Sequence, residues 1–96
     1  MISTHVLDTE LGEPAAGMKV GLFRGKELVS LQETDDNGRI AELGQPPEPG
    51  EYRLVFHVAN GFFEKVELTI AIADPDSHYH VPLLVSSFQC TTYRGS

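Results

Sequence analysis

The chain has 96 residues, of which 41% are hydrophobic and 22% are charged, and its formal net charge is −7. This length suits one modest core, so we predict a single domain over residues 1–96. The acidic balance argues against a nucleic-acid surface, because binding there depends on clustered Lys and Arg that neutralise phosphates, and no apolar run is long enough to cross a bilayer.

Two features bear on the compartment. The first residues, MISTHVLDTELG, lack the basic start and the apolar segment of a secretory signal. The only cysteine, Cys90, cannot form an internal disulfide, which fits a reducing environment. We therefore expect a cytoplasmic protein, with Cys90 as a small strand residue rather than a reactive thiol.

Strand signals begin near the N-terminus. Apolar residues recur at period two between clusters of Gly, Pro, Asn and Asp, which is typical of the short strands of a sandwich or barrel. The first clear strand covers residues 17–25 and the second covers 26–35. Asn37-Gly38 in DDNGR tolerates the positive φ of a tight hairpin, so a short third strand is expected over 39–43.

The middle of the chain continues this pattern. After the stiff loop GQPPEPG, residues 51–59 alternate as a strand, and Asn60-Gly61 marks another turn. Residues 63–73 form the next expected strand, and ADPDS reads as a loop.

The segment from His78 to Ser86 alternates differently. Its two faces are Tyr79, Val81, Leu83 and Val85 on one side and His78, His80, Pro82 and Leu84 on the other. A strand of an antiparallel sheet with one solvent-exposed face would alternate more cleanly between apolar and polar residues. We therefore expect a second copy of the chain to cover the second face, in a homo-oligomer whose interface contains both histidines.

Histidine is the side chain best suited to proton transfer near neutral pH, and the chain has four. His78 and His80 share one strand face, a spacing that also suits two metal ligands. His5, before an apolar pair, is either a surface residue or part of a site. His57 fits a solvated strand position.

The last six residues, TTYRGS, are unusual for a chain end, because a frayed polar tail is the ordinary expectation there. Arg94 can hydrogen-bond a planar, oxygen-rich ligand in a fixed fork. Gly95 lets the backbone come close, and Ser96 offers a hydroxyl and a terminal carboxylate.

Three stretches together resemble the 5-hydroxyisourate hydrolase family, the transthyretin-related enzymes of urate breakdown. ISTHVLDTELGEPAAGMKV resembles the family's opening around a site histidine, here His5, and TDDNGRI resembles the segment with its site arginine, here Arg39. HYHVPLL and the final TTYRGS resemble its C-terminal signature, here His80 with Tyr93, Arg94, Gly95 and Ser96. TDDNGRI alone is a weak signal, whereas HYHVPLL with a terminal YRGS is a strong one.

The resemblance implies an all-β, transthyretin-like sandwich of two antiparallel sheets with Greek-key topology and at most one short helix. It also implies a homotetramer, a dimer of dimers, with sites at the subunit interface and the tail as an edge strand there. No cofactor and no metal are implied.

The implied reaction is the hydrolysis of 5-hydroxyisourate to 2-oxo-4-hydroxy-4-carboxy-5-ureidoimidazoline by attack of water on a ring carbonyl. The implied catalytic residues are His5, Arg39, His80 and Ser96, and the implied substrate-binding residues are Arg39, Tyr93, Arg94 and Gly95. We favour His80 as the base that deprotonates water, with His5 helping to position it. The two arginines would stabilise the oxyanion, and Ser96 would orient a histidine or relay its proton.

Two departures from the family pattern concern the frame of the site. Ser87 stands where relatives usually have a proline, which bears on the turn before the last strand. Between Val58 and Phe62 only Ala-Asn-Gly remains, where relatives usually carry a longer segment with a short helix. We therefore expect that helix to be reduced or missing.

Three alternatives stay open at this point. A transthyretin-like carrier would bind a small aromatic ligand without turning it over, although transthyretin proper lacks the YRGS ending and the site histidines. A metal-dependent hydrolase would use His78 and His80 as ligands. A plain sandwich domain in adhesion or an accessory role would need only the hairpin motif.

Overall fold

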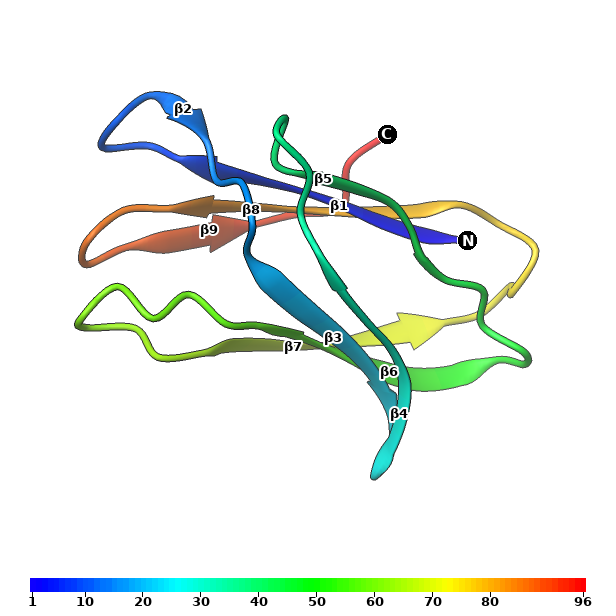
Figure 1. Cartoon of the computed structure of the whole chain (residues 1–96). Coiled ribbons are helices and arrows are strands. Elements are labelled where there is room, and N and C mark those ends of the chain that lie inside the picture. Colours follow the sequence, from blue (N-terminus) through cyan, green and yellow to red (C-terminus); the bar gives the residue numbers. More distant parts are fainter.

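The protein is described by a computed structural model that covers residues 1–96 and contains strands but no helix (Figure 1). The strands are β1 (Ile2–Asp8), β2 (Glu13–Pro14), β3 (Lys19–Arg24), β4 (Glu27–Glu33), β5 (Arg39–Gly44), β6 (Gly50–Phe56), β7 (Val66–Ile72), β8 (Tyr79–Val85) and β9 (Cys90–Thr92). One sheet has the order β2-β1-β8-β9 with β5 also paired to β1, and the other has the order β4-β3-β6-β7. The predicted two-sheet sandwich is confirmed.

Most of the expected strands are present, but the DDNGR turn is not a hairpin. Strand β5 pairs with β1 in one sheet, whereas β4 pairs with β3 in the other. The turn therefore carries the chain between sheets. Gly38 alone supplies the positive φ, at 74°, and Asn37 does not. The local turn chemistry was interpreted correctly, but it does not fix which strand becomes the partner of β5.

Strand β1 was not predicted, yet it is central to its sheet. Its alternation of apolar and polar residues is not visible in the sequence, because a polar residue, Thr4, lies on the core face. Thr4 is buried there and donates a hydrogen bond to the Val81 carbonyl at 2.6 Å. β1 pairs with β8 in parallel along its whole length, while every other strand pair is antiparallel. This parallel pair brings the N-terminal residues beside the HYH segment.

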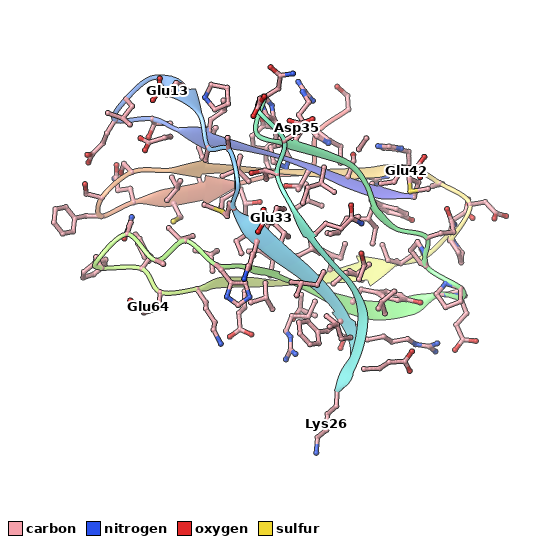
Figure 2. The ribbon with its side chains drawn as sticks, in the orientation of Figure 1. Glu13, Lys26, Glu33, Asp35, Glu42 and Glu64 are labelled. Carbon is pink, nitrogen blue, oxygen red and sulfur yellow. The ribbon has the colours of Figure 1, made fainter.

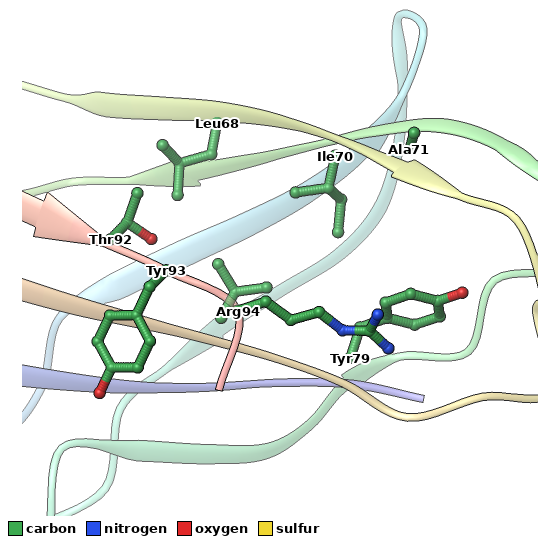
Figure 3. A pocket seen from close by; sticks show the side chains of 8 residues that line it. Leu68, Ile70, Ala71, Tyr79, Thr92, Tyr93 and Arg94 are labelled. Carbon is green, nitrogen blue, oxygen red and sulfur yellow. The ribbon is translucent and has the colours of Figure 1, made fainter. Parts of the chain in front are cut away.

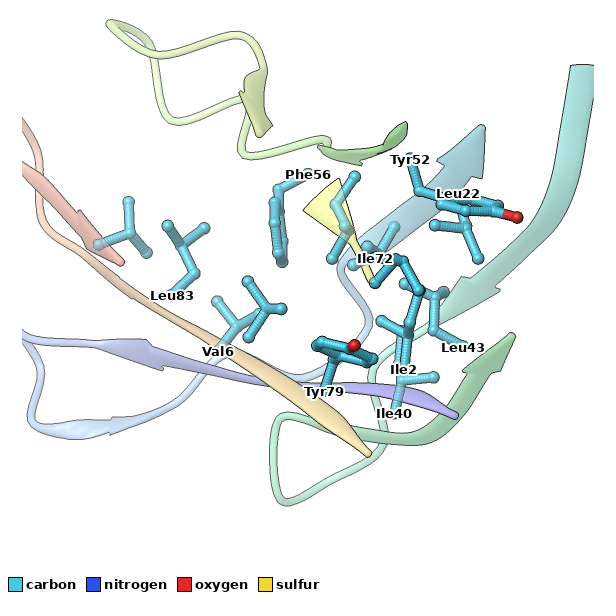
Figure 4. Packing of buried hydrophobic residues seen from close by; sticks show 14 residues of the cluster. Ile2, Val6, Leu22, Ile40, Leu43, Tyr52, Phe56, Ile72, Tyr79 and Leu83 are labelled. Atoms are coloured by element: carbon cyan, nitrogen blue, oxygen red, sulfur yellow. The ribbon is translucent and has the colours of Figure 1, made fainter. Parts of the chain in front are cut away.

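The core lies between the two sheets (Figure 4). The Tyr79, Val81, Leu83 and Val85 face of β8 lies in this core. The cluster consists of Ile2, Val6, Val20, Leu22, Ile40, Leu43, Tyr52, Leu54, Phe56, Ile72, Tyr79, Val81, Leu83 and Val85. The inward residues of β7 are less buried, with Leu68 and Ile70 only partly covered. The reason is that β7 is an edge strand, beside the open side of the sandwich.

The loop after Val58 contains no helix, as expected. The Asn60 side-chain oxygen instead accepts backbone hydrogen bonds from Phe62 and Phe63, at 3.1 and 2.8 Å, in the short connection from β6 to β7. The Lys26 side chain labelled in Figure 2 projects away from the core, and Glu33 and Glu64 are also exposed. None of the structure's elements is a helix long and apolar enough to span a membrane.

Candidate active site

The turn after β4 positions Arg39. The Asp35 carboxylate accepts hydrogen bonds from the backbone N–H groups of Asn37 and Arg39, both at 2.9 Å. Gly38 packs directly on β1, where its carbonyl accepts the Val6 N–H at 2.7 Å. A Cβ at residue 38 would lie 2.4 Å from the Val6 oxygen, so only glycine allows this approach. The following residue, Arg39, is thereby fixed at the start of β5.

Pairing with β1 then places Arg39 opposite His5, and the parallel pairing on the other side of β1 places Ser3 beside His80. Ser3 and His5 are two residues apart on one strand and so lie on one face. Segments that are far apart in the sequence therefore meet on the outer face of the β1 sheet.

Ser3 joins two histidines. Its Oγ atom lies 2.8 Å from Nε2 of His78 and 2.8 Å from Nδ1 of His80. The Ser3 residue is buried, with 7% of its surface exposed, whereas His80 is half-buried and His78 is exposed. Ser3 carries no motif of its own in the sequence, and only recognition of β1 as a strand could have placed it on the face of His5.

The C-terminal segment closes the other side of the His80 ring. Gly95 forms an isolated bridge with His80 and donates its N–H to the His80 carbonyl at 2.7 Å. A Cβ on Gly95 would lie 2.6 Å from Cδ2 of that ring. The imidazole is therefore held between a hydroxyl on one edge and a glycine backbone on the other.

These residues surround a cavity of about 300 Å³. Its lining consists of Ser3, Thr4, Arg39, Ile40, Ala41, His78, His80 and Ser96. Three of the four predicted catalytic residues, Arg39, His80 and Ser96, thus share one cavity. His5 lies beside them through its pairing with Arg39 but does not line the cavity.

The surroundings of His80 favour the neutral form of its imidazole. Burial is the largest cause that lowers its pKa from the ordinary 6.5, followed by the positive charge of Arg39 and then by His78 and His5. A neutral imidazole can accept a proton at neutral pH. The cavity therefore holds a proton acceptor beside a guanidinium, which is a pairing suited to attack by water on a carbonyl.

Arg94 and Tyr93 lie elsewhere. The Arg94 guanidinium stacks on the Tyr79 ring, 4.6 Å from its centroid, and approaches the His78 carbonyl at 3.4 Å. Both residues border a second, mainly apolar cavity of about 230 Å³ between β7 and β9, where Leu68 and Ile70 lie opposite Arg94 (Figure 3). Within one chain, Arg94 does not reach the His80 cavity.

Two further candidates lie outside the cavity. The backbone N–H of His57 donates to the Lys19 carbonyl at 2.9 Å, in the sheet that does not contain His80. Burial raises the pKa of the Cys90 thiol, which packs against the core. A raised pKa disfavours the thiolate, so Cys90 is poorly suited to act as a nucleophile.

Comparison with known proteins identifies the family of the chain. A family model described as HIUase/Transthyretin family matches residues 2–95. The chain belongs to this family. It is 41% identical to 5-hydroxyisourate hydrolase 2 of Rhizobium meliloti (strain 1021), over 99% of this chain and 95% of that protein. That alignment spans 114 positions, so it contains gaps in this shorter chain.

Solved structures give the same result. The structure of Klebsiella pneumoniae 5-hydroxyisourate hydrolase superposes with a TM-score of 0.90 at 33% identity, covering 99% of this chain and 97% of that one. Sea bream transthyretin in complex with thyroxine superposes with a TM-score of 0.86 at 23% identity, covering 98% and 93%. The second match shows the shared fold only.

Proposed function

We propose that this chain hydrolyses 5-hydroxyisourate to 2-oxo-4-hydroxy-4-carboxy-5-ureidoimidazoline, a step of urate breakdown, without a metal or a cofactor. The observation that carries the proposal is that His80 and Arg39 line one cavity, where burial and the Arg39 charge lower the pKa of the imidazole. The relatives named for this hydrolysis and the match over nearly the whole chain support it.

The proposed reaction begins when water attacks a ring carbonyl carbon and gives a proton to Nε2 of His80. No protein group hydrogen-bonds this nitrogen, whereas Nδ1 is held by Ser3. Arg39 stabilises the oxyanion of the tetrahedral intermediate, an interaction whose loss typically costs about 3 kcal/mol. The intermediate then collapses, the C–N bond breaks, and the proton on His80 passes to the leaving nitrogen. One water is consumed, and no covalent intermediate with the protein forms.

The remaining predicted residues receive supporting roles in this proposal. His5, opposite Arg39, helps to position the water, and Ser96, which lines the cavity, orients a histidine or relays its proton through its hydroxyl or terminal carboxylate. Gly95 allows the terminal segment to approach. Arg94 and Tyr93 contribute to substrate binding in the assembled protein, at the subunit interface.

We propose a homotetramer, built as a dimer of dimers, as the working form. The support is the pair of sheet edges β7 and β9, which have no partner on their outer sides and which flank the apolar cavity containing Arg94. Unpaired edges of this kind are usually covered in native proteins. Sedimentation velocity checks this proposal: four chains per particle are expected, and a monomer at assay concentration would contradict it.

We also propose that the protein works in the cytoplasm, where a lone thiol stays reduced. Fractionation of the native cells would test this, with the protein expected in the cytoplasmic fraction and its recovery from an extracytoplasmic fraction contradicting the proposal.

The activity is tested by generating 5-hydroxyisourate in situ with urate oxidase and following its ultraviolet decay. The purified protein should accelerate the decay in proportion to its concentration, with the same rate after treatment with a chelator. Decay at the spontaneous rate would refute the proposed function. Activity lost on chelation and restored by a divalent metal would instead support a metal-dependent hydrolase.

A further inference from the structure

Ser3 and His78 line the cavity, and neither has a role in the reaction proposed above. The Ser3 hydroxyl carries one proton but lies within hydrogen-bond distance of two ring nitrogens, both at 2.8 Å. It can donate to only one of them, so the other nitrogen must carry a proton and donate to Ser3. The protonation of the two imidazoles is therefore linked through one oxygen.

We propose that Ser3 and His78 form a proton relay behind His80, in which His80 donates from Nδ1 to Ser3 and Ser3 donates to Nε2 of His78. This inference rests on the proposed function, since His80 is the base of that reaction. Ser3 is the positioning residue that fixes the His80 tautomer. His78 is the outer end of the relay.

The direction of the chain of donors follows from the cavity. If Ser3 donated to His80 instead, Nε2 of His80 would carry the proton of the neutral ring and could not accept one from water. Nδ1 of His80 is held by Ser3 at 2.8 Å, and the Cδ2 edge of the ring packs against Gly95, so Nε2 is the nitrogen that remains for the water. The guanidinium of Arg39, a group with donors only, also favours a lone pair on the cavity side.

The proton movements balance. When water gives a proton to Nε2 of His80, the Nδ1 proton passes to Ser3 Oγ, and the Ser3 proton passes to Nε2 of His78. His80 ends neutral, with its proton on Nε2, and His78 becomes the imidazolium. The positive charge thus moves away from Arg39, from a half-buried ring to one that is more exposed within the single chain, so that burial disfavours the charged form less. Reversal of the same movements returns the proton to the leaving nitrogen.

Nitrogen-15 NMR of the folded protein reads the tautomer without any assay of activity. We expect the neutral His80 ring to be protonated at Nδ1 and unprotonated at Nε2. This tautomer preference should be lost in Ser3→Ala but kept in Ser3→Thr, which retains a hydroxyl. Protonated Nε2 in the neutral wild-type ring would overturn the proposal. If the protein proved inactive while the NMR result held, the hydrolase function would fail and the hydrogen-bond arrangement would stand.

Kinetics test the relay itself. Ser3→Ala should lower kcat by about tenfold to a hundredfold, less than the roughly 10² to 10⁴ that a general base supplies, with little change in KM and with activity restored in Ser3→Thr. His78→Gln, which keeps hydrogen bonding but cannot become a cation, should lower kcat to a similar extent. Ser30→Ala and His57→Gln, on the other sheet, are the matched controls. Wild-type kcat in Ser3→Ala or in His78→Gln, with folding confirmed by calorimetry, would refute the relay.

Discussion

Gly95 gives the sharpest test of how the His80 ring is held. A Cβ at this position would lie 2.6 Å from Cδ2 of His80 and 3.3 Å from Cγ of Pro82, whereas ordinary contact begins at 3.4 Å. Gly95→Ala must therefore displace the ring or the terminal segment by about 0.8 Å, the difference between the ordinary and the imposed distance. Ser3 Oγ contacts the opposite edge of the ring at 2.8 Å. A displacement of the ring therefore disturbs this hydrogen bond and the position of His80 in the cavity.

A misplacement of about 1 Å can cost on the order of 10²-fold in rate, which corresponds to about 2.7 kcal/mol of barrier. We therefore expect kcat/KM for 5-hydroxyisourate to fall by about 10²-fold in Gly95→Ala, with a melting temperature close to that of the wild type. The assay is ultraviolet decay of substrate generated in situ. Gly21→Ala is the control, since its Cβ would meet the Phe23 ring at 3.0 Å on the other sheet. Unchanged kcat/KM in folded Gly95→Ala would refute this account of ring placement.

Three other changes test the frame of the site. Arg39→Gln should move the acidic limb of the kcat/KM profile to higher pH. The base works above its pKa, and the Arg39 charge is the second-largest cause, after burial, that holds the pKa of His80 below 6.5. An acidic limb that stays in place or moves to lower pH would argue against the proximity of Arg39 and His80. Gly38→Ala should unfold the protein at markedly lower denaturant concentration, since its Cβ would lie 2.4 Å from the Val6 oxygen at a φ of 74°; wild-type stability would contradict the close approach. Asp35→Ala should cost about 1 to 2 kcal/mol in the free energy of unfolding through two lost backbone hydrogen bonds, and a change below about 0.3 kcal/mol would show that these bonds contribute little.

The sequence was sufficient to predict those strands in which apolar and polar residues alternate clearly. The inward face of β8 was predicted from period two, and the same reasoning applied to the last strand puts Thr92 and Arg94 on one face. Both residues do line the apolar cavity, whereas the neighbouring Gly95 pairs with His80. Tyr93, which strict alternation would put on the other face, lines the same cavity, so alternation alone does not explain why Arg94 and His80 lie in different cavities.

What the sequence could not supply is long-range pairing. β1 was missed because its buried Thr4 satisfies its hydroxyl on Val81, a contact across 77 positions. The bridge from Ser3 to His78 and His80 is equally non-local and depends on the parallel register of β1 with β8. No turn or propensity signal encodes that register, so Ser3 could be assigned a role only after the fold was known.

The central claim is that a neutral His80 imidazole is the base. Its most direct test compares the decay of freshly generated 5-hydroxyisourate with wild-type protein and with His80→Asn, after both have been shown to fold and assemble alike. The account predicts that the enzymatic rate falls by about 10² to 10⁴ in the variant. Equal rates for the two proteins would contradict it.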